Sequence, residues 1–267
     1  MDPERFLDED IGYGDITTEL LVPDADGKAE VTCESDAVIA GLEEAVTIFE
    51  SRGVRCIPFT MDGERVKKGT VVLAVSGPLR MIITAERTAL NFMIRMSGIA
   101  TETNEIVTRC RRINKNIRIS GTRKTTPGFR YFEKKAIVLG GGDPHRYGLD
   151  EMILVKDNHI RAAGGMNNVI GLLRTAAPEK KVEIEVENIE DALTAAEYAD
   201  IVMIDNADPA KAKAIADAVR VIGDIVIEVS GNITKDNAAS YADIADVISM
   251  GSLTHSVRAV HFSLNIE

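Results

Sequence analysis

The sequence predicts an α/β fold that contains a β/α barrel. From residue 118 onward, six segments rich in β-branched residues each end in charged, amide or hydroxyl residues. Four helical segments are expected between them, at 166–176, 189–199, 208–222 and 234–243. Strands that alternate with helices form parallel sheets, and six such units fit a barrel, complete or incomplete, better than an open sheet.

The first hundred residues mix both kinds of element. We expect helices and strands in this order: a helix at 3–9 with Pro3 in its first turn, a connecting segment at 12–23, an alternating strand at 28–35, a helix at 42–53 closed by Gly53, a strand at 54–59, and a hairpin at 62–78. A long helix at 82–112 shows apolar residues at helical spacing, and Gly98 is expected to kink it. The final run, 258–267, predicts a strand that returns to this N-terminal part.

Composition and charge narrow the possible functions. With 267 residues, 45% of them hydrophobic, the chain can form one large or two ordinary domains. No apolar run approaches the ~20 residues of a membrane span, and the acidic start lacks the apolar core of a signal peptide. Its three cysteines are widely spaced, which favours a reducing cytoplasm. A net charge of −11 argues against nucleic acid or anionic membranes as partners.

Against this acidic background, residues 109–161 hold 13 Lys and Arg against 5 Asp and Glu. On charge alone, a solvated basic helix face explains such an excess. A basic focus in an acidic protein is also what a small polyanion would need.

In barrels the reactive groups lie at the carboxyl ends of the strands. Reading off those ends gives Arg123, Lys124, Lys156, Asn158, Glu185, Asp205, Asn206, Ser230, Gly231, Asn232, Gly251 and His255. Three of these are cations, and Arg146 adds a fourth from the same basic stretch. Each cation alone has the properties of an ordinary ion-pair residue. Together they would repel one another unless a multiply charged anion joined them.

Other residues in the same region leave alternatives open. Glu185 and Asp205 can hold Mg²⁺ through oxygen ligands and water, or can simply balance Lys124 and Lys156. His145 and His159 can act as acid or base, although hydrogen bonding within the site suits the pattern better.

Two short segments of small residues, 230–232 and 250–256, can cradle phosphate or can be plain turns. Arg87 has the pattern of a surface helix arginine, and His261 that of a structural residue in the last strand.

Nine segments in order resemble the quinolinate phosphoribosyltransferase family, also called nicotinate-nucleotide pyrophosphorylase (carboxylating). They are GDITTELLVP, ERTALNF with SGIAT, GTRKTTPGFR, GGGDPHRYGL, ILVKDNH, EVEN, MIDN, EVSGNIT and ISMGSLTHS. The resemblance covers nearly the whole chain.

The resemblance implies an N-terminal α/β sandwich at 1–103, joined by the C-terminal strand 257–267, and an open β/α barrel at 104–256, as in type II phosphoribosyltransferases. It also implies a homo-oligomer, either a dimer or a hexamer built of dimers, in which Arg87 completes the neighbouring site. The implied activity transfers phosphoribosyl from phosphoribosyl pyrophosphate to quinolinate with decarboxylation.

The site residues that the resemblance implies fall into three groups. Quinolinate is expected to contact Thr122, Arg123, Lys124, His145, Arg146 and Lys156. Glu185 and Asp205 are expected to bind the ribose and Mg²⁺. Together with Lys124 and Lys156 they form the expected catalytic set. The phosphates are expected to bind at Ser230, Gly231, Asn232, Met250, Gly251 and Ser252, with His255 beside them.

The sequence departs from the family pattern at three places: DPHR follows the glycines, SGN replaces SGG, and His261 stands where an aspartate is usual. Two alternatives to the transferase remain open. One is a lyase that uses Lys156 as a Schiff base, and the other is a non-catalytic or altered-substrate paralogue.

Overall fold

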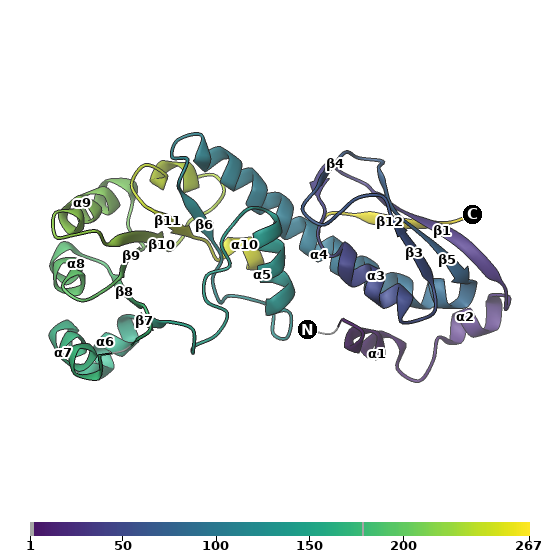
Figure 1. Ribbon diagram of the computed structural model, residues 1–267, viewed down its shortest axis with the longest axis horizontal. Coiled ribbons are helices and arrows are strands. Elements are labelled where there is room, and N and C mark those ends of the chain that lie inside the picture. The colour runs from purple at the N-terminus through teal and green to yellow at the C-terminus, as the bar shows by residue number, and fades with distance from the viewer. Residues whose placement is uncertain (1–2, 178) are drawn as a thin grey trace. The chain divides into compact units, whose positions relative to one another are not determined.

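A computed structural model describes residues 3–177 and 179–267, which form two compact units. The first unit contains the chain up to Asn104, together with Tyr131–Gly141 and Val257–Glu267. The second contains Glu105–Arg130 and Gly142–Ser256. Figure 1 shows the elements of each unit.

A four-stranded antiparallel sheet forms the centre of the first unit. Its order is β12 (Phe262–Ile266), β1 (Asp26–Cys33), β5 (Val71–Pro78) and β3 (Arg55–Pro58). Alternate residues of β1, from Ala29 to Cys33, are buried, as one apolar face requires. The C-terminal strand therefore pairs with the N-terminal part of the chain. Two further short strands, β2 (Ala37–Val38) and β4 (Arg65–Val66), pair separately.

Among the described helices of this unit, α2 (Ile16–Leu21) forms where the sequence predicted a connection. Helix α1 (Arg5–Ile11), α3 (Leu42–Glu50) and α4 (Leu79–Arg111) match expected helices. Residues 12–23 were expected to be a connection, but α2 (Ile16–Leu21) forms there. The Asp15 side chain accepts a hydrogen bond from the Thr18 N–H at 3.0 Å, and this cap offsets the poor helix propensity of the β-branched residues that follow.

Helix α5 (Arg130–Leu139) corrects the expected domain boundary. Residues 131–141 were placed with the barrel, yet they belong to the first unit. The Phe132 ring packs edge-on against Phe92 with centroids 4.8 Å apart. The fully buried Glu133 accepts a hydrogen bond from Arg95 at 2.6 Å. These contacts lie on the hidden face of one helix, and sequence periodicity does not indicate which unit such a face will meet.

Helix α4 continues through Gly98 without a break, so the expected kink is absent from the described helix. A Cβ at Gly98 would lie 2.5 Å from the backbone oxygen of Arg258. Glycine is needed here because another backbone approaches closely.

Six parallel strands form the second unit, as predicted. Their order in the sheet is β6 (Arg118–Ser120), β11 (Val247–Ser249), β10 (Val226–Ser230), β9 (Ile201–Asp205), β8 (Val182–Val186) and β7 (Ile153–Val155). Five α-helices follow strands in this unit: α6 (Asp157–Ala163), α7 (Met166–Ala176), α8 (Ile189–Ala196), α9 (Pro209–Arg220) and α10 (Ser252–His255). Among the described residues no ladder joins β6 to β7, so the barrel is open.

The helix expected at 234–243 is only a short 3-10 turn, η1 (Ala238–Tyr241). The Asn237 side chain accepts a hydrogen bond from the Thr234 N–H at 2.8 Å and donates one to the Asn232 carbonyl at 3.2 Å. Such side-chain bonds to the backbone compete with helix formation.

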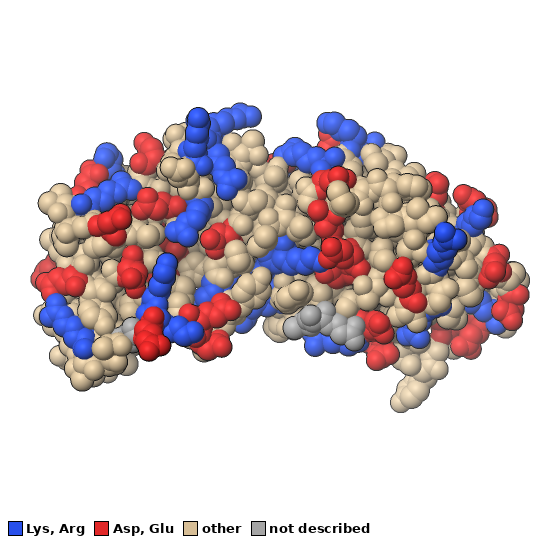
Figure 2. All heavy atoms as spheres, in the orientation of Figure 1, with Lys and Arg blue, Asp and Glu red and all other residues tan. Residues whose placement is uncertain are grey.

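None of the helices in the described part of the chain combines the length and the apolar character that crossing a bilayer requires. On the face drawn in Figure 2, basic and acidic side chains are interspersed over each unit.

Substitution of Gly98 by alanine should lower the free energy of unfolding by about 1–3 kcal/mol, because the added methyl group would overlap the Arg258 carbonyl. Gly171 is the matched control. It lies within α7 with no atom within 4 Å of an added Cβ, so Gly171→Ala should stabilise by about 0.5–1 kcal/mol. Urea unfolding midpoints would measure both. A Gly98→Ala protein as stable as the parent would contradict the close-approach account.

Candidate active site

The parallel sheet brings the ends of six strands to one edge of the second unit. The predicted residues of this unit lie at or just beyond those ends: Thr122, Arg123 and Lys124 after β6, Lys156 after β7, Glu185 in β8, Asp205 in β9, Ser230, Gly231 and Asn232 at β10, and Met250, Gly251, Ser252 and His255 after β11. His145 and Arg146 lie in the connection before β7. Arg87 lies on α4 in the first unit.

Charges from four strand ends act on one another at this edge. The Nζ of Lys156 lies 2.5 Å from Oε2 of Glu185 on the neighbouring strand. Burial and the negative charge of Glu185 raise the pKa of Asp205, while Lys156 and Lys124 act in the opposite direction. The two carboxylates are therefore near enough to repel, and two lysines partly neutralise them.

This arrangement fits a hard divalent cation. Glu185 and Asp205 offer carboxylate oxygens, which Mg²⁺ prefers, and a shared cation would relieve the repulsion that raises the pKa of Asp205. Two protein carboxylates suit an ion that keeps water or substrate oxygens as its other ligands.

A tight turn after β10 joins two strand ends through their amide side chains. Asn232 Nδ2 donates to Asn206 Oδ1 at 2.9 Å, and Asn206 Nδ2 donates to Asp205 Oδ2 at 2.5 Å. Gly231 has a φ of +85°, and a Cβ there would lie 2.6 Å from the Asn206 backbone nitrogen. Glycine is therefore required at this position, and Asn232 holds the turn against the end of β9.

The segment after β11 lies against Lys124. A Cβ on Gly251 would lie 2.9 Å from Cδ of Lys124 and 3.1 Å from Nε2 of His255. The Thr254 hydroxyl donates to the Lys124 carbonyl at 2.6 Å. Met250 differs from its neighbours, because its side chain is buried and its N–H already donates to the Ser120 carbonyl at 2.9 Å. Its N–H is therefore not open to a phosphate.

Arg123 and Arg146 form a pair of like charges. Burial and the positive charge of Arg123 both lower the pKa of Arg146. Arg146 is only 8% exposed, and its Nη1 donates to the Met152 carbonyl at 3.2 Å. Two guanidinium groups near enough for their charges to interact would suit a multiply charged anion.

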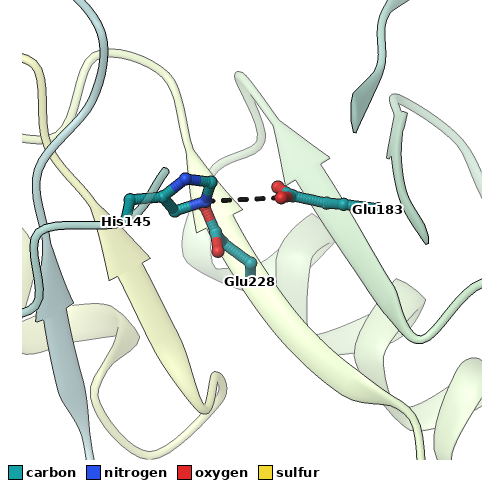
Figure 3. Close-up of side chains that lie close together, drawn as sticks. All are labelled: His145, Glu183 and Glu228. Carbon is teal, nitrogen blue, oxygen red and sulfur yellow. Dashed lines mark ion pairs between the residues drawn. The ribbon is translucent and has the colours of Figure 1, made fainter. Parts of the chain in front are cut away.

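His145 reaches into the interior of the second unit, where its ring lies close to two glutamates that the sequence did not assign to the site (Figure 3). Its Nε2 lies 3.3 Å from Oε2 of Glu183 and 3.5 Å from Oε1 of Glu228. Both glutamates are essentially unexposed, and the three possible ligand atoms lie within 4.8 Å of one another. An acidic residue flanked by buried β-branched residues, as in VEIEV and VIEVS, was the available signal.

His159 and His261 have local roles. His159 Nδ1 accepts the Lys156 N–H at 2.9 Å and so caps the start of α6. The His261 carbonyl accepts the Glu34 N–H at 2.9 Å within the first unit.

Family models match both units of the chain. The quinolinate phosphoribosyl transferase C-terminal domain matches residues 99–265, and the N-terminal domain of the same family matches residues 15–97. The chain belongs to the quinolinate phosphoribosyl transferase family.

Relatives within the quinolinate phosphoribosyl transferase family span nearly the whole chain. A probable nicotinate-nucleotide pyrophosphorylase (carboxylating) of Archaeoglobus fulgidus is 40% identical, over 95% of this chain and 98% of that protein. The human nicotinate-nucleotide pyrophosphorylase (carboxylating) is 37% identical, over 90% of this chain and 82% of that protein. The solved structure of the nicotinate-nucleotide pyrophosphorylase from Francisella tularensis has a TM-score of 0.91 at 34% identity, covering 99% of this chain and 94% of that one.

Within this quinolinate phosphoribosyl transferase chain, the predicted two-part architecture is confirmed. The strand-end residues of the barrel meet at one edge, whereas Arg87 belongs to the other unit. Its side chain is 59% exposed, and its Nη2 lies 3.9 Å from the Glu86 carboxylate, its ion-pair partner among the described residues.

In a Glu185→Gln variant, the pKa of Asp205 should fall, because the charge that repels it is removed and Lys156 is released from its ion pair. Carboxyl-carbon NMR titration would measure the change. Glu190→Gln, an exposed substitution at the start of α8, is the matched control and should leave Asp205 unchanged. An unchanged or higher Asp205 pKa in the first variant would contradict the described geometry.

Proposed function

We propose that this chain transfers the phosphoribosyl group of phosphoribosyl pyrophosphate to quinolinate and releases pyrophosphate, CO₂ and nicotinate mononucleotide. The proposal rests on two observations in the same unit: the like-charge interaction of Arg123 with Arg146, and the Lys156–Glu185 ion pair at the strand ends. The name carboxylating nicotinate-nucleotide pyrophosphorylase, which the relatives carry, supports the same reaction.

Quinolinate suits the cationic part of the site because its two carboxylates can each meet a guanidinium or ammonium group. Arginine pairs a carboxylate bidentately, and lysine supplies a point charge. In this proposal Arg123, Arg146 and His145 bind the carboxylates, and Thr122 and Lys124 line the same loop. The dianion offsets the repulsion that otherwise remains between Arg123 and Arg146.

The transfer step forms a bond between the pyridine nitrogen and the anomeric carbon of the ribose as the bond to pyrophosphate breaks. Positive charge develops on the sugar ring in such a step, and the carboxylates of Glu185 and Asp205 would stabilise it. The segments at Ser230–Asn232 and at Gly251 and Ser252, with His255, would hold phosphate groups. Positioning supplies much of the rate gain, because the two substrates meet in one orientation.

Mg²⁺, when bound at Glu185 and Asp205, would neutralise charge on the departing pyrophosphate. The protein groups have a separate role, since Lys156 keeps Glu185 in place through its 2.5 Å ion pair.

Loss of CO₂ follows from the product of the transfer. The pyridine nitrogen is now positively charged, so the electron pair of the breaking C–C bond moves into the ring at C2. That carbon then takes up a proton, and nicotinate mononucleotide results.

The lyase alternative is weakened by the same ion pair. A Schiff base needs a neutral lysine amine as its nucleophile. Lys156 instead donates to Glu185 as an ammonium group. A non-catalytic or altered-substrate paralogue would bind anions without releasing pyrophosphate, and the turnover assay separates it from the transferase.

We further propose that two copies of the chain complete each site, with Arg87 reaching the neighbour's substrate, in a dimer or a hexamer built of dimers. An exposed arginine on a well-formed helix suits such a role. The described cysteines are all free, which supports the proposed reducing, cytoplasmic location.

The protein incubated with quinolinate, phosphoribosyl pyrophosphate and Mg²⁺ should release CO₂ and pyrophosphate in equal amounts. Arg123→Ala should raise the KM for quinolinate about 10- to 100-fold, because one charge-assisted pair is lost. The KM for phosphoribosyl pyrophosphate should change much less. Asp217→Asn, in an exposed pair with Lys213, is the control. Folded protein without turnover would contradict the proposed function.

Mixing two inactive variants tests the shared site. Arg87→Ala and Lys156→Ala proteins, dissociated and reassociated together, should recover activity, because a mixed dimer contains one site with both residues intact. Each variant reassociated with itself is the control. No recovery in mixed oligomers of verified composition would contradict a site built from two copies.

A further inference from the structure

Three ionisable groups lie together inside the barrel unit, below the strand-end residues. Glu183 on β8 is 0% exposed and Glu228 on β10 is 1% exposed. The His145 side chain is 12% exposed and enters from the connection before β7. Figure 3 shows Nε2 of the imidazole directed at the Glu183 carboxylate, with the Glu228 side chain close to the same ring nitrogen.

Two buried carboxylates need a positive partner. Taking an ion out of water costs several kcal/mol even after relaxation. Neither Glu183 oxygen has a hydrogen-bond partner among the described residues, and the 3.3 Å contact to His145 is an ion pair longer than a well-formed hydrogen bond. Within the described part of the chain, His145 is the one basic side chain within 4.0 Å of either carboxylate.

The other groups around the trio reinforce this arrangement. From β11, the Ser249 hydroxyl donates a short hydrogen bond to Glu228. From the loop itself, the Asp143 carboxylate accepts the backbone N–H of His145 at 2.7 Å. Arg146 follows in sequence, close enough to Glu183 for their charges to interact, and Arg123 lies beyond it. From β9, Ile201 and Met203 contribute no charge.

The backbone at His145 is held in an uncommon conformation. Its φ is +53°, in the left-handed region that a histidine seldom adopts. Such a conformation persists only where surrounding contacts fix it. Here it follows Pro144 and is stabilised by the Asp143 side chain. The result is that Nε2 points to the glutamates and the Nδ1 edge faces away from them.

We propose that Glu183 and Glu228 are positioning residues that keep His145 protonated, so that its Nδ1–H is a permanent cationic donor to a substrate carboxylate. The inference deepens the proposed function and rests on it. It gives a function to two glutamates whose burial would otherwise only lower the stability of the fold. It also explains why the imidazole serves as a fixed charge and not as an acid or base.

The direction of the histidine titration agrees with this geometry. Burial alone would lower the pKa of His145, but the two carboxylates outweigh burial and raise it to about 10. Because the pKa is raised, the positive charge is present at every pH below that value and is lost only as the pH rises through it. An ordinary histidine would already be neutral at pH 8.

The charge of His145 can be measured without any activity. In protein with nitrogen-15 histidine, the ring signals of His145, assigned by their loss in His145→Asn, should remain those of an imidazolium from pH 6 to pH 9. In Glu228→Gln the same signals should titrate at least one pH unit lower than in the parent. A neutral imidazole at pH 8 in the parent protein would overturn the proposal and leave the proposed function untouched.

The kinetic consequence is a change in pH profile. The ratio of Glu228→Gln to parent kcat/KM for quinolinate should fall about tenfold between pH 6 and pH 8.5, since the protonated fraction of a histidine falls about tenfold per pH unit above its pKa. Glu190→Gln should keep a constant ratio. A purely structural role for Glu228 predicts a ratio that does not vary with pH, and that result would overturn the proposal. If Glu228→Gln fails to fold, Glu183→Gln provides the same test.

A divalent transition metal is the competing occupant, because one imidazole nitrogen and two carboxylate oxygens within 4.8 Å suit such an ion as well. If a proton on Nε2 of His145, and not a metal ion, lies between the imidazole and the glutamates, Zn²⁺ added alone at pH 7 should leave the His145 ring signals unchanged. Tight stoichiometric binding of Zn²⁺ that converts them to metal-bound imidazole would overturn the proposal.

Discussion

Like charges held together at one edge of a parallel sheet are the constraint on which the rest of this structure depends. Burial and the positive charge of Arg123 together lower the pKa of Arg146. A surface would relieve such repulsion by letting the side chains move into water. Arg146 instead is nearly buried and donates a hydrogen bond to the Met152 carbonyl, so its side chain is not free to move into water. In the proposed function, a multiply charged anion bound beside both guanidinium groups would offset this repulsion.

Acidic residues near the cations lower the cost of these charges to the stability of the fold. Glu185 forms an ion pair with Lys156, and the carboxylates of Glu183 and Glu228 lie 3.3 Å and 3.5 Å from Nε2 of His145. Removing one member of a buried ion pair commonly costs 3–5 kcal/mol, whereas the intact pair contributes little net stability. The charged interior is thus retained for what it does at the site. Stability comes from the apolar faces of the sheets and helices around it.

The sequence predicted the strands well and the buried polar partners poorly, for physical reasons. Strand ends are visible because β-branched runs stop at polar residues, and this rule located Arg123, Lys156 and Asp205. The expected helix 166–176 agrees with α7, since its apolar period is undisturbed. Glu183 and Glu228 were not predicted as site residues, because their burial and their partners depend on strands far apart in the chain. The same holds for α5, whose unit is decided by tertiary contacts such as Phe132 with Phe92.

Calorimetric titration of the protein with quinolinate and with nicotinate, at low and moderate salt, tests most directly whether the cationic edge is one site for a dianion. The two acids differ by a single carboxylate, so the comparison isolates the second charge. The account predicts quinolinate binding at least about tenfold tighter than nicotinate binding, with a gap that narrows as salt rises. Equal affinities, or a difference independent of salt, would contradict it.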